Sequence, residues 1–302
     1  MRLVKDRILF VVAVILYGTI GLFLRFVDLP SEAVAFYRGV IGGTCILVYK
    51  LIEKEKPDLK AIRNNLVLLI LSGVMLGLNW IFLFAAYVNT TVAVASLCNY
   101  MAPVLVVLLT PLILKERLDW RKIPCILAAL AGIVLVSGVF GGDIGNPLGI
   151  LYGLLAAACF TVLVFLNRKL KDISAFDRSF VQLYLSALTI FPYMMIHNGG
   201  WFPFPSDLQS GLIVLMLGIL HTGVAYCFYF NGMAVLPVQT LAILGYLEPV
   251  VSVLCSALFL QEAMGVPGWI GAVLILAAAV VSERISPPGK KQDKPSEKTT
   301  PE

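Results

Sequence analysis

The sequence carries little charge for its length. Asp, Glu, Lys and Arg make up 14% of its 302 residues, whereas a soluble domain carries about a quarter. The charges are also unevenly spread, because long uncharged stretches alternate with short charged links. This composition excludes an ordinary soluble domain. The net charge of +5 belongs to the links, so we expect no nucleic-acid partner.

Motifs that would carry other chemistry are missing as well. No G-x-x-x-x-G-K-[ST] phosphate loop occurs, so the sequence does not predict ATP hydrolysis within this chain. The six cysteines stand singly in apolar stretches without CxxC spacing, and they indicate neither a zinc site nor a disulfide framework. We expect no metal and no cofactor.

Long apolar stretches are abundant. Each has nearly the ~20 residues that cross a bilayer as a helix, and the short links require neighbouring helices to run antiparallel. We therefore predict an all-α membrane protein with ten transmembrane helices. The tail 286–302 is rich in Pro, Lys and Glu and is predicted to be disordered and cytoplasmic. The predicted spans are 7–25, 32–51, 65–88, 91–114, 121–140, 148–168, 176–197, 210–231, 238–260 and 266–284.

The basic residues predict the orientation of these spans. Nearly all of the 23 Lys and Arg residues lie in the amino end, in every second link, or in the tail. The opposite links carry acidic residues instead, namely Asp28, Glu32, Asp143 and Asp207. By the positive-inside rule both termini are predicted to be cytoplasmic, and we expect a multi-pass protein of the plasma membrane.

The two halves of the sequence resemble each other. Tyr100-Met-Ala-Pro103 matches Tyr246-Leu-Glu-Pro249, and further matches follow at the same offset. Because five spans per half is an odd number, the second half would enter the membrane from the other side. We predict an inverted repeat with one unit at 1–140 and another at 147–285. This arrangement is typical of secondary transporters, whose site between the repeats faces either side in turn.

These motifs resemble those of EamA-type transporters of the drug/metabolite transporter superfamily. Tyr100-Met101-Ala102-Pro103 and Leu247-Glu248-Pro249-Val250 look like the proline-containing fourth helix of that family, and Phe36-Tyr37-Arg38 resembles its arginine-bearing second helix. The resemblance covers nearly the whole chain apart from the tail. It implies two EamA-like five-helix units that export or import amino acids, other metabolites or drugs.

Glu248 is the most informative single residue. It lies about ten residues into its predicted span, and a carboxylate near the middle of a bilayer costs on the order of 3 kcal/mol. It could titrate protons or balance a cationic substrate. Alternatively, it could have a structural role where Pro249 interrupts the helix.

Arg38 and His221 are further candidates inside the spans. Arg38 could extend towards the membrane surface, pair with an acid, or bind a substrate carboxylate. His221 could take part in proton coupling, or it could be a hydrogen-bonded residue of the interior. The remaining polar and aromatic candidates could line a substrate cavity or make hydrogen bonds between helices. They are Tyr17, Asn79, Trp80, Asn99, Tyr100, Tyr226 and Tyr246.

The leading hypothesis is therefore a secondary active transporter, with export of a small polar or amphipathic metabolite as the working direction. Proton coupling would act through Glu248. The alternative is an uncoupled exchanger or facilitator of the same fold. An intramembrane enzyme is less favoured, because the spans hold neither paired aspartates nor a GxSG-like serine beside His221. The partners are the bilayer and the substrate, and the chain could be a monomer or a homodimer.

Overall fold

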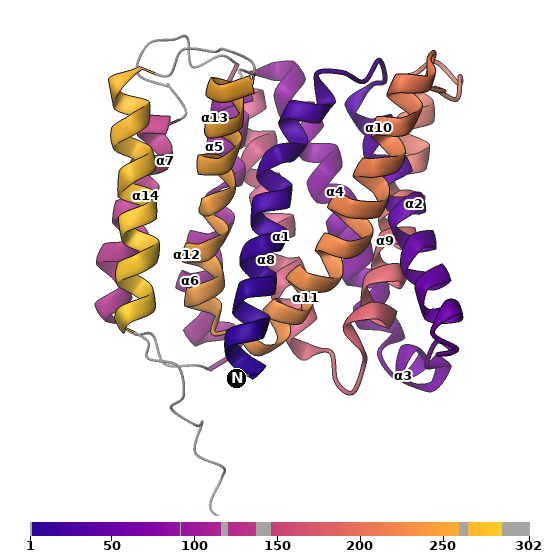
Figure 1. Cartoon of the computed structure of the whole chain (residues 1–302), viewed down its shortest axis with the longest axis horizontal. Helices are drawn as coiled ribbons and strands as arrows, with labels where there is room; N and C mark the ends of the chain where they lie inside the picture. The colour runs from indigo at the N-terminus through magenta and orange to yellow at the C-terminus, as the bar shows by residue number, and fades with distance from the viewer. Residues whose placement is uncertain (1, 91, 116–119, 137–145, 260–264, 286–302) are drawn as a thin grey trace, which may run out of the picture.

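The structure is a computed structural model that describes residues 2–90, 92–115, 120–136, 146–259 and 265–285. Throughout these residues the regular elements are helices, and none is a strand. The long helices stand side by side as one bundle, with their axes close to a common direction (Figure 1). The first helix begins, and the last one ends, at the same end of the bundle (Figure 1). The predicted disordered tail lies outside the described residues.

Within the described residues, seven helical segments are long and apolar enough to cross a membrane: Val4–Leu24, Ser31–Ile52, Leu66–Asn89, Val94–Ile113, Pro147–Lys169, Ala175–His197 and Leu208–Val235. Shorter apolar helices cover Ile123–Leu135, Thr240–Ser252 and Val266–Ala278. These ten segments correspond in order to the ten predicted spans. Three of the predicted spans, 91–114, 121–140 and 238–260, include residues outside the described part, so the count of ten crossings stays a prediction.

The helix bounds are as follows: α1 Arg2–Leu24, α2 Ser31–Ile52, α3 Leu59–Asn64, α4 Leu66–Asn89, α5 Val92–Asn99, α6 Ala102–Ile113, α7 Ile123–Val136, α8 Pro147–Lys169, α9 Ala175–His197, α10 Leu208–Gly218, α11 Ala225–Val235, α12 Val238–Gly245, α13 Leu247–Phe259 and α14 Val266–Ile285. A short 3₁₀ turn, η1, covers Trp120–Lys122. A π-helical segment, η3, covers Ile219–Val224 and joins α10 to α11.

The distribution of apolar and polar side chains between surface and interior differs from that of a soluble protein. Large apolar side chains such as Leu112 and Ile196 are 76% and 82% exposed. Several polar side chains are instead buried, and they satisfy one another through hydrogen bonds. Gln182, for example, donates to Ser72 and to Asn167. An apolar surface of this kind fits a lipid environment.

Prolines explain why two predicted spans are each divided into two helices. Pro103 and Pro249 have no backbone N–H, so neither can bond to the carbonyl four residues earlier. Those earlier residues are Asn99 and Gly245, where α5 and α12 end. The chain therefore breaks beside Tyr100 and Tyr246, which are the matching positions of the sequence repeat.

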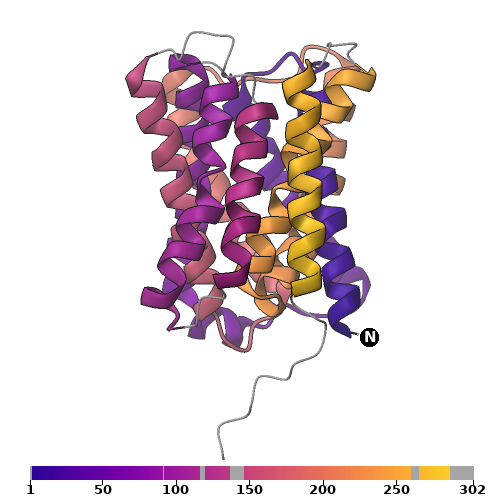
Figure 2. The same cartoon turned by 90° about the vertical axis from the view of Figure 1, so that its left-hand side faces the viewer.

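Corresponding helices of the two sequence halves pack against each other. Helix α2 packs on α9, and α7 packs on α14. Within each pair the two helices run in opposite directions (Figure 1). The pair α7 and α14 forms one side of the bundle, which faces the viewer in Figure 2. Helix α4 lies between α8 and α9 and contacts both.

Small residues permit the contact between α4 and α9. A Cβ added to Gly77 would lie 2.7 Å from the Cβ of Thr189 and 3.0 Å from the carbonyl oxygen of Ser186. We expect Gly77→Ala to lower the free energy of unfolding by about 1–3 kcal/mol, because the added methyl group overpacks this contact. Thermal unfolding of the purified protein in detergent measures the effect. The matched control is Gly211→Ala, because nothing lies within 4 Å of that position; an equal loss in both variants would contradict the packing argument.

Asp28 connects two links at the end of the bundle opposite the N-terminus. Its carboxylate accepts hydrogen bonds from the hydroxyl and from the backbone N–H of Ser206. These bonds lower the pKa of Asp28 below its usual value. The contribution of these bonds to the stability of the fold is therefore fully present at neutral pH. It is lost only as the pH falls through that lowered pKa. We expect Asp28→Ala to accelerate amide hydrogen exchange around Ser206 severalfold at pH 7, whereas wild-type protection persists at pH 5.

Candidate substrate cavity

A cavity of about 410 Å³ lies between helices from both halves of the chain. Its walls are largely aromatic and apolar, with a few polar groups, which is the usual composition of a small-molecule site. The polar and aromatic lining residues are Tyr17, Arg38, Asn79, Trp80, Phe84, Tyr87, Ser96, Asn99, Tyr100, Phe160, Tyr226, Tyr229, Phe230, Glu248 and Ser252.

The cavity occupies the middle of the bundle and the half that lies away from the N-terminus. Its lining residues on α1 run from Tyr17 to Leu24, and those on α4 from Leu76 to Tyr87. Both helices begin at the end of the bundle where the chain begins (Figure 1). The lining thus uses the second part of each helix.

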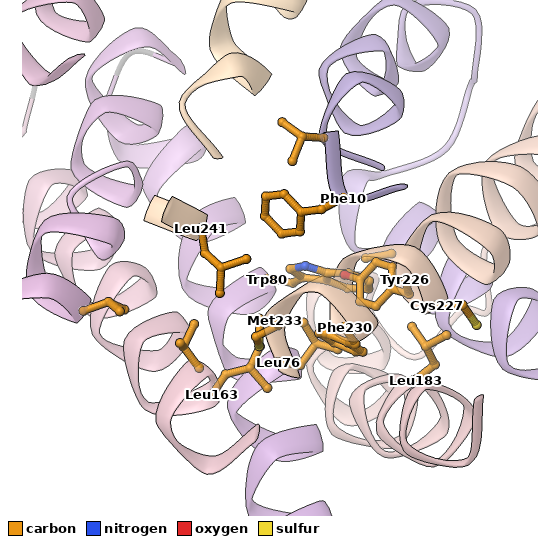
Figure 3. Close-up of a cluster of buried hydrophobic side chains, with 14 of the residues drawn as sticks. Phe10, Leu76, Trp80, Leu163, Leu183, Tyr226, Cys227, Phe230, Met233 and Leu241 are labelled. Atoms are coloured by element: carbon orange, nitrogen blue, oxygen red, sulfur yellow. The ribbon is translucent and has the colours of Figure 1, made fainter. Parts of the chain in front are cut away.

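Buried apolar side chains fill the bundle between the cavity and the N-terminal end. Phe10, Met233 and Leu241 are at most 8% exposed and belong to one cluster with Trp80 and Tyr226 (Figure 3). Phe10 stacks on Tyr229 at 4.8 Å between ring centroids. These side chains pack together as part of one apolar core.

Polar contacts tie the helices together at the same end. Lys50 forms an ion pair with Asp177 at 2.7 Å, and both side chains are buried. The amide of Asn231 donates to Asp6 at 2.9 Å. Arg178 donates to the carbonyl of Phe230 at 2.5 Å. These contacts join α2 to α9, α1 to α11 and α9 to α11, so polar contacts as well as apolar packing hold these helices together between the cavity and the N-terminal end.

Arg38 supplies the positive charge of the cavity wall. Its Nε donates to the hydroxyl of Thr222 at 3.0 Å, and its guanidinium carbon lies 5.1 Å from the ring centroid of Trp80. Among the described residues, no carboxylate lies within 4 Å of it and no acceptor takes a hydrogen bond from its terminal nitrogens. Arg38 therefore lines the cavity with N–H donors on its terminal nitrogens that no described residue accepts.

Glu248 supplies the negative charge. It is the second residue of α13, where the positive end of the helix dipole favours a carboxylate. Within the described part of the chain its carboxylate has no hydrogen-bond or ion-pair partner. Gly18 lets α1 approach closely here, since an added Cβ would lie 2.7 Å from the carbonyl oxygen of Glu248. Arg38 is near enough for the two charges to interact.

Eight of the ten predicted site residues lie in the cavity wall: Tyr17, Arg38, Asn79, Trp80, Asn99, Tyr100, Tyr226 and Glu248. Their contact with a substrate stays a prediction. Asn79 also makes hydrogen bonds between helices, because its amide donates to the side chain of Asn99 at 3.1 Å and to the carbonyl of Ala156 at 2.9 Å. Asn79 therefore lines the cavity and also makes hydrogen bonds between helices.

The other two predicted residues lie outside the cavity wall. His221 is 2% exposed, and its Nε2 hydrogen-bonds to the hydroxyl of Thr19 at 2.9 Å. Tyr246 is fully buried in a second cluster, formed mainly with residues of α7 and α14. The sequence places both residues at mid-span, but it does not say which side of the helix faces the cavity.

Several lining residues, notably Tyr87 and Tyr229, are not among the predicted site residues. Helical periodicity could have indicated them. Tyr229 lies three residues after Tyr226, and Tyr87 lies seven residues after Trp80. Both spacings place the later residue on the face of the earlier one. Where the structure describes side chains, no group of three or more His, Cys, Asp and Glu residues could hold a metal ion.

Comparison with known proteins identifies the family. A model described as the EamA-like transporter family matches residues 7–138 and again residues 147–283. The chain belongs to the EamA-like transporter family. Family membership confirms the resemblance seen in the sequence, and it makes this protein a membrane transporter with a small-molecule substrate rather than an enzyme.

Several relatives of this EamA-like transporter carry transporter names. It is similar to the uncharacterized transporter YxxF of Bacillus subtilis, with 28% identity over 90% of this chain and 87% of the relative. It is also similar to the aromatic amino acid exporter YddG of Ancylobacter novellus, with 29% identity over 66% of this chain and 68% of the relative. A crystal structure with 23% identity matches 93% of this chain and 98% of its own with a TM-score of 0.81, which supports the fold.

Proposed function

We propose that this EamA-like transporter is a secondary active exporter of small amphipathic metabolites that carry a carboxylate. The observation that carries the proposal is the cavity, where unpaired Arg38 and Glu248 face one aromatic space of about 410 Å³. A guanidinium inside a membrane bundle without an acid partner is costly. A substrate carboxylate would offset that cost with a bidentate, charge-assisted hydrogen bond.

The proposed transport cycle rests on two inverted five-helix repeats. Three observations support this arrangement: the family model matches the chain twice, α2 and α9 pack together while running in opposite directions, and the helices break at the matching positions Tyr100 and Tyr246. Rocking of one repeat against the other would close the cavity at one end and open it at the other. The packed side chains and polar contacts between the cavity and the N-terminal end would form the closed end.

Two observations support export as the direction of transport. The distribution of basic residues predicts that both termini are cytoplasmic, so the closed end would face the cytoplasm and the structure would represent an outward-facing state. The relative YddG is named as an exporter. The driving force would be the proton gradient, with Glu248 carrying the proton, because this carboxylate lies in the cavity without a fixed partner.

A second candidate function is an uncoupled exchanger. It is favoured by the position of Glu248 in the first turn of α13 beside Pro249, where a carboxylate stabilises the helix start without titrating. In that case substrate flux would proceed without a proton in the opposite direction.

Flux into liposomes that contain the purified protein tests the proposal. We would add a panel of metabolites, with L-phenylalanine as the first probe, and follow the lumen pH with an enclosed dye. The expected result is saturable flux of a carboxylate-bearing amphiphile with a change in lumen pH. Flux without a pH change selects the uncoupled exchanger. If no solute crosses faster than in protein-free liposomes, the proposed function is wrong.

A further inference from the structure

The π-helical segment η3 interrupts the eighth long apolar stretch beside α2. A π-helical turn adds one residue to the helical ladder, and such turns are frequent at functional sites. The hydroxyl of Thr222 donates to the carbonyl of Leu217, five residues earlier, at 2.9 Å. Thr222 is fully buried. Its oxygen still has a lone pair to offer, and that lone pair faces α2.

Glycines bring α2 against this segment. A Cβ on Gly42 would lie 2.8 Å from the methyl carbon of Thr222 and 3.1 Å from the carbonyl oxygen of Gly218. A Cβ on Gly218 would lie 2.5 Å from the Cβ of Ile41. Side chains at these positions would push the two helices apart. The close approach places Arg38, one turn before Gly42 on the same face of α2, directly against Thr222.

Two contacts then fix the orientation of the Arg38 side chain. The Nε–H bonds to Thr222 at 3.0 Å, and the guanidinium lies over the indole of Trp80. Trp80 is itself held edge-on by Tyr226, with 6.3 Å between ring centroids. The hydrogen bond and the cation–π contact together define both the position and the plane of the guanidinium.

We propose that Thr222 is a positioning residue, which uses the π-helical turn to hold Arg38 so that its two terminal nitrogens present a bidentate site for the carboxylate of the transported molecule. This inference rests on the proposed function and deepens it. A flexible arginine would lose side-chain entropy on binding, whereas a fixed one has lost it already. We call Arg38 and Thr222 in this arrangement the clamp. The clamp would lower the KM for carboxylates without changing the transport step.

The partners of Arg38 favour this role over a purely structural one. A structural arginine in a membrane interior pairs with an acid or with backbone carbonyls. Arg178 of this chain does so, since it donates to the carbonyl of Phe230. Arg38 has neither kind of partner among the described residues, and only its Nε is bound, to a neutral hydroxyl. Arg38 itself lines the cavity.

Transport kinetics in liposomes test the clamp. The probes are L-phenylalanine and L-phenylalaninamide, which lacks the carboxylate. We expect Thr222→Val to raise the KM for L-phenylalanine about tenfold while the maximal rate stays within about twofold. Thr222→Ser keeps the hydroxyl and should restore the wild-type KM. The KM for the amide should be the same in all three proteins, because the amide cannot use the bidentate site.

Thr110→Val is the matched control, because Thr110 is a buried threonine outside the cavity whose hydroxyl bonds to the carbonyl of Val106 at 2.7 Å. An unchanged KM for L-phenylalanine in Thr222→Val, or an equal rise for both probes, overturns the clamp. Wild-type protein that carries only solutes without a carboxylate also overturns it, yet leaves the transporter function standing. Wild-type protein that carries no solute removes the proposed function and the clamp together.

Discussion

Arg38→Gln should lower the ratio of maximal rate to KM for L-phenylalanine about a hundredfold or more. The glutamine keeps much of the volume of arginine, but it loses the charge and the planar fork that matches a carboxylate. Arg38→Lys should recover little of the loss, because an ammonium neither stacks on Trp80 in the same way nor binds two oxygens at once. Initial rates in liposomes, measured over a range of probe concentrations, check both variants.

Arg63→Gln is the control for the loss of a positive charge. Arg63 lies in α3, is exposed, and is not among the residues that line the cavity. It should leave transport unchanged. If Arg38→Gln carries L-phenylalanine like the wild type, Arg38 has a structural role and the preference for a carboxylate is wrong.

Glu248→Gln should abolish accumulation against a gradient. One charge moved through 100 mV provides about 2.3 kcal/mol, which corresponds to about fiftyfold accumulation of substrate. A glutamine cannot carry the proton, so the variant should only equilibrate the substrate across the membrane. Exchange of labelled for unlabelled L-phenylalanine should continue, since it needs no net proton movement. The measurement is the ratio of internal to external probe under an imposed potential and pH gradient.

Glu53→Gln is the matched control, because Glu53 is exposed at the end of α2. It should accumulate the probe like the wild type. Full accumulation by Glu248→Gln would contradict proton coupling through this residue and would favour the uncoupled exchanger. A loss of exchange together with a lower unfolding temperature would instead indicate that Glu248 stabilises the start of α13.

The sequence predicted much of the architecture because hydrophobic length is a local property. Each predicted span corresponds to an apolar helical segment, and the prolines at 103 and 249 explain the two breaks. It did not predict the π-helical turn at Thr222, since no residue type specifies an extra residue in a helical ladder. It also did not show that His221 and Tyr246 are not among the residues that line the cavity, because the rotation of a helix depends on its neighbours.

The sequence by itself determined that lipid surrounds this protein, because its long stretches carry too few charges for a surface in water. It also determined the family, because the motifs around Pro103 and Pro249 resemble those of EamA-like transporters and the family model matches the chain. Only the tertiary structure decided which polar groups meet. Arg38 and Thr222 lie 184 residues apart along the chain, and glycine contacts between α2 and the π-helical segment bring them together. Such contacts depend on how the helices pack against one another, and this packing cannot be inferred from the composition and periodicity of the sequence.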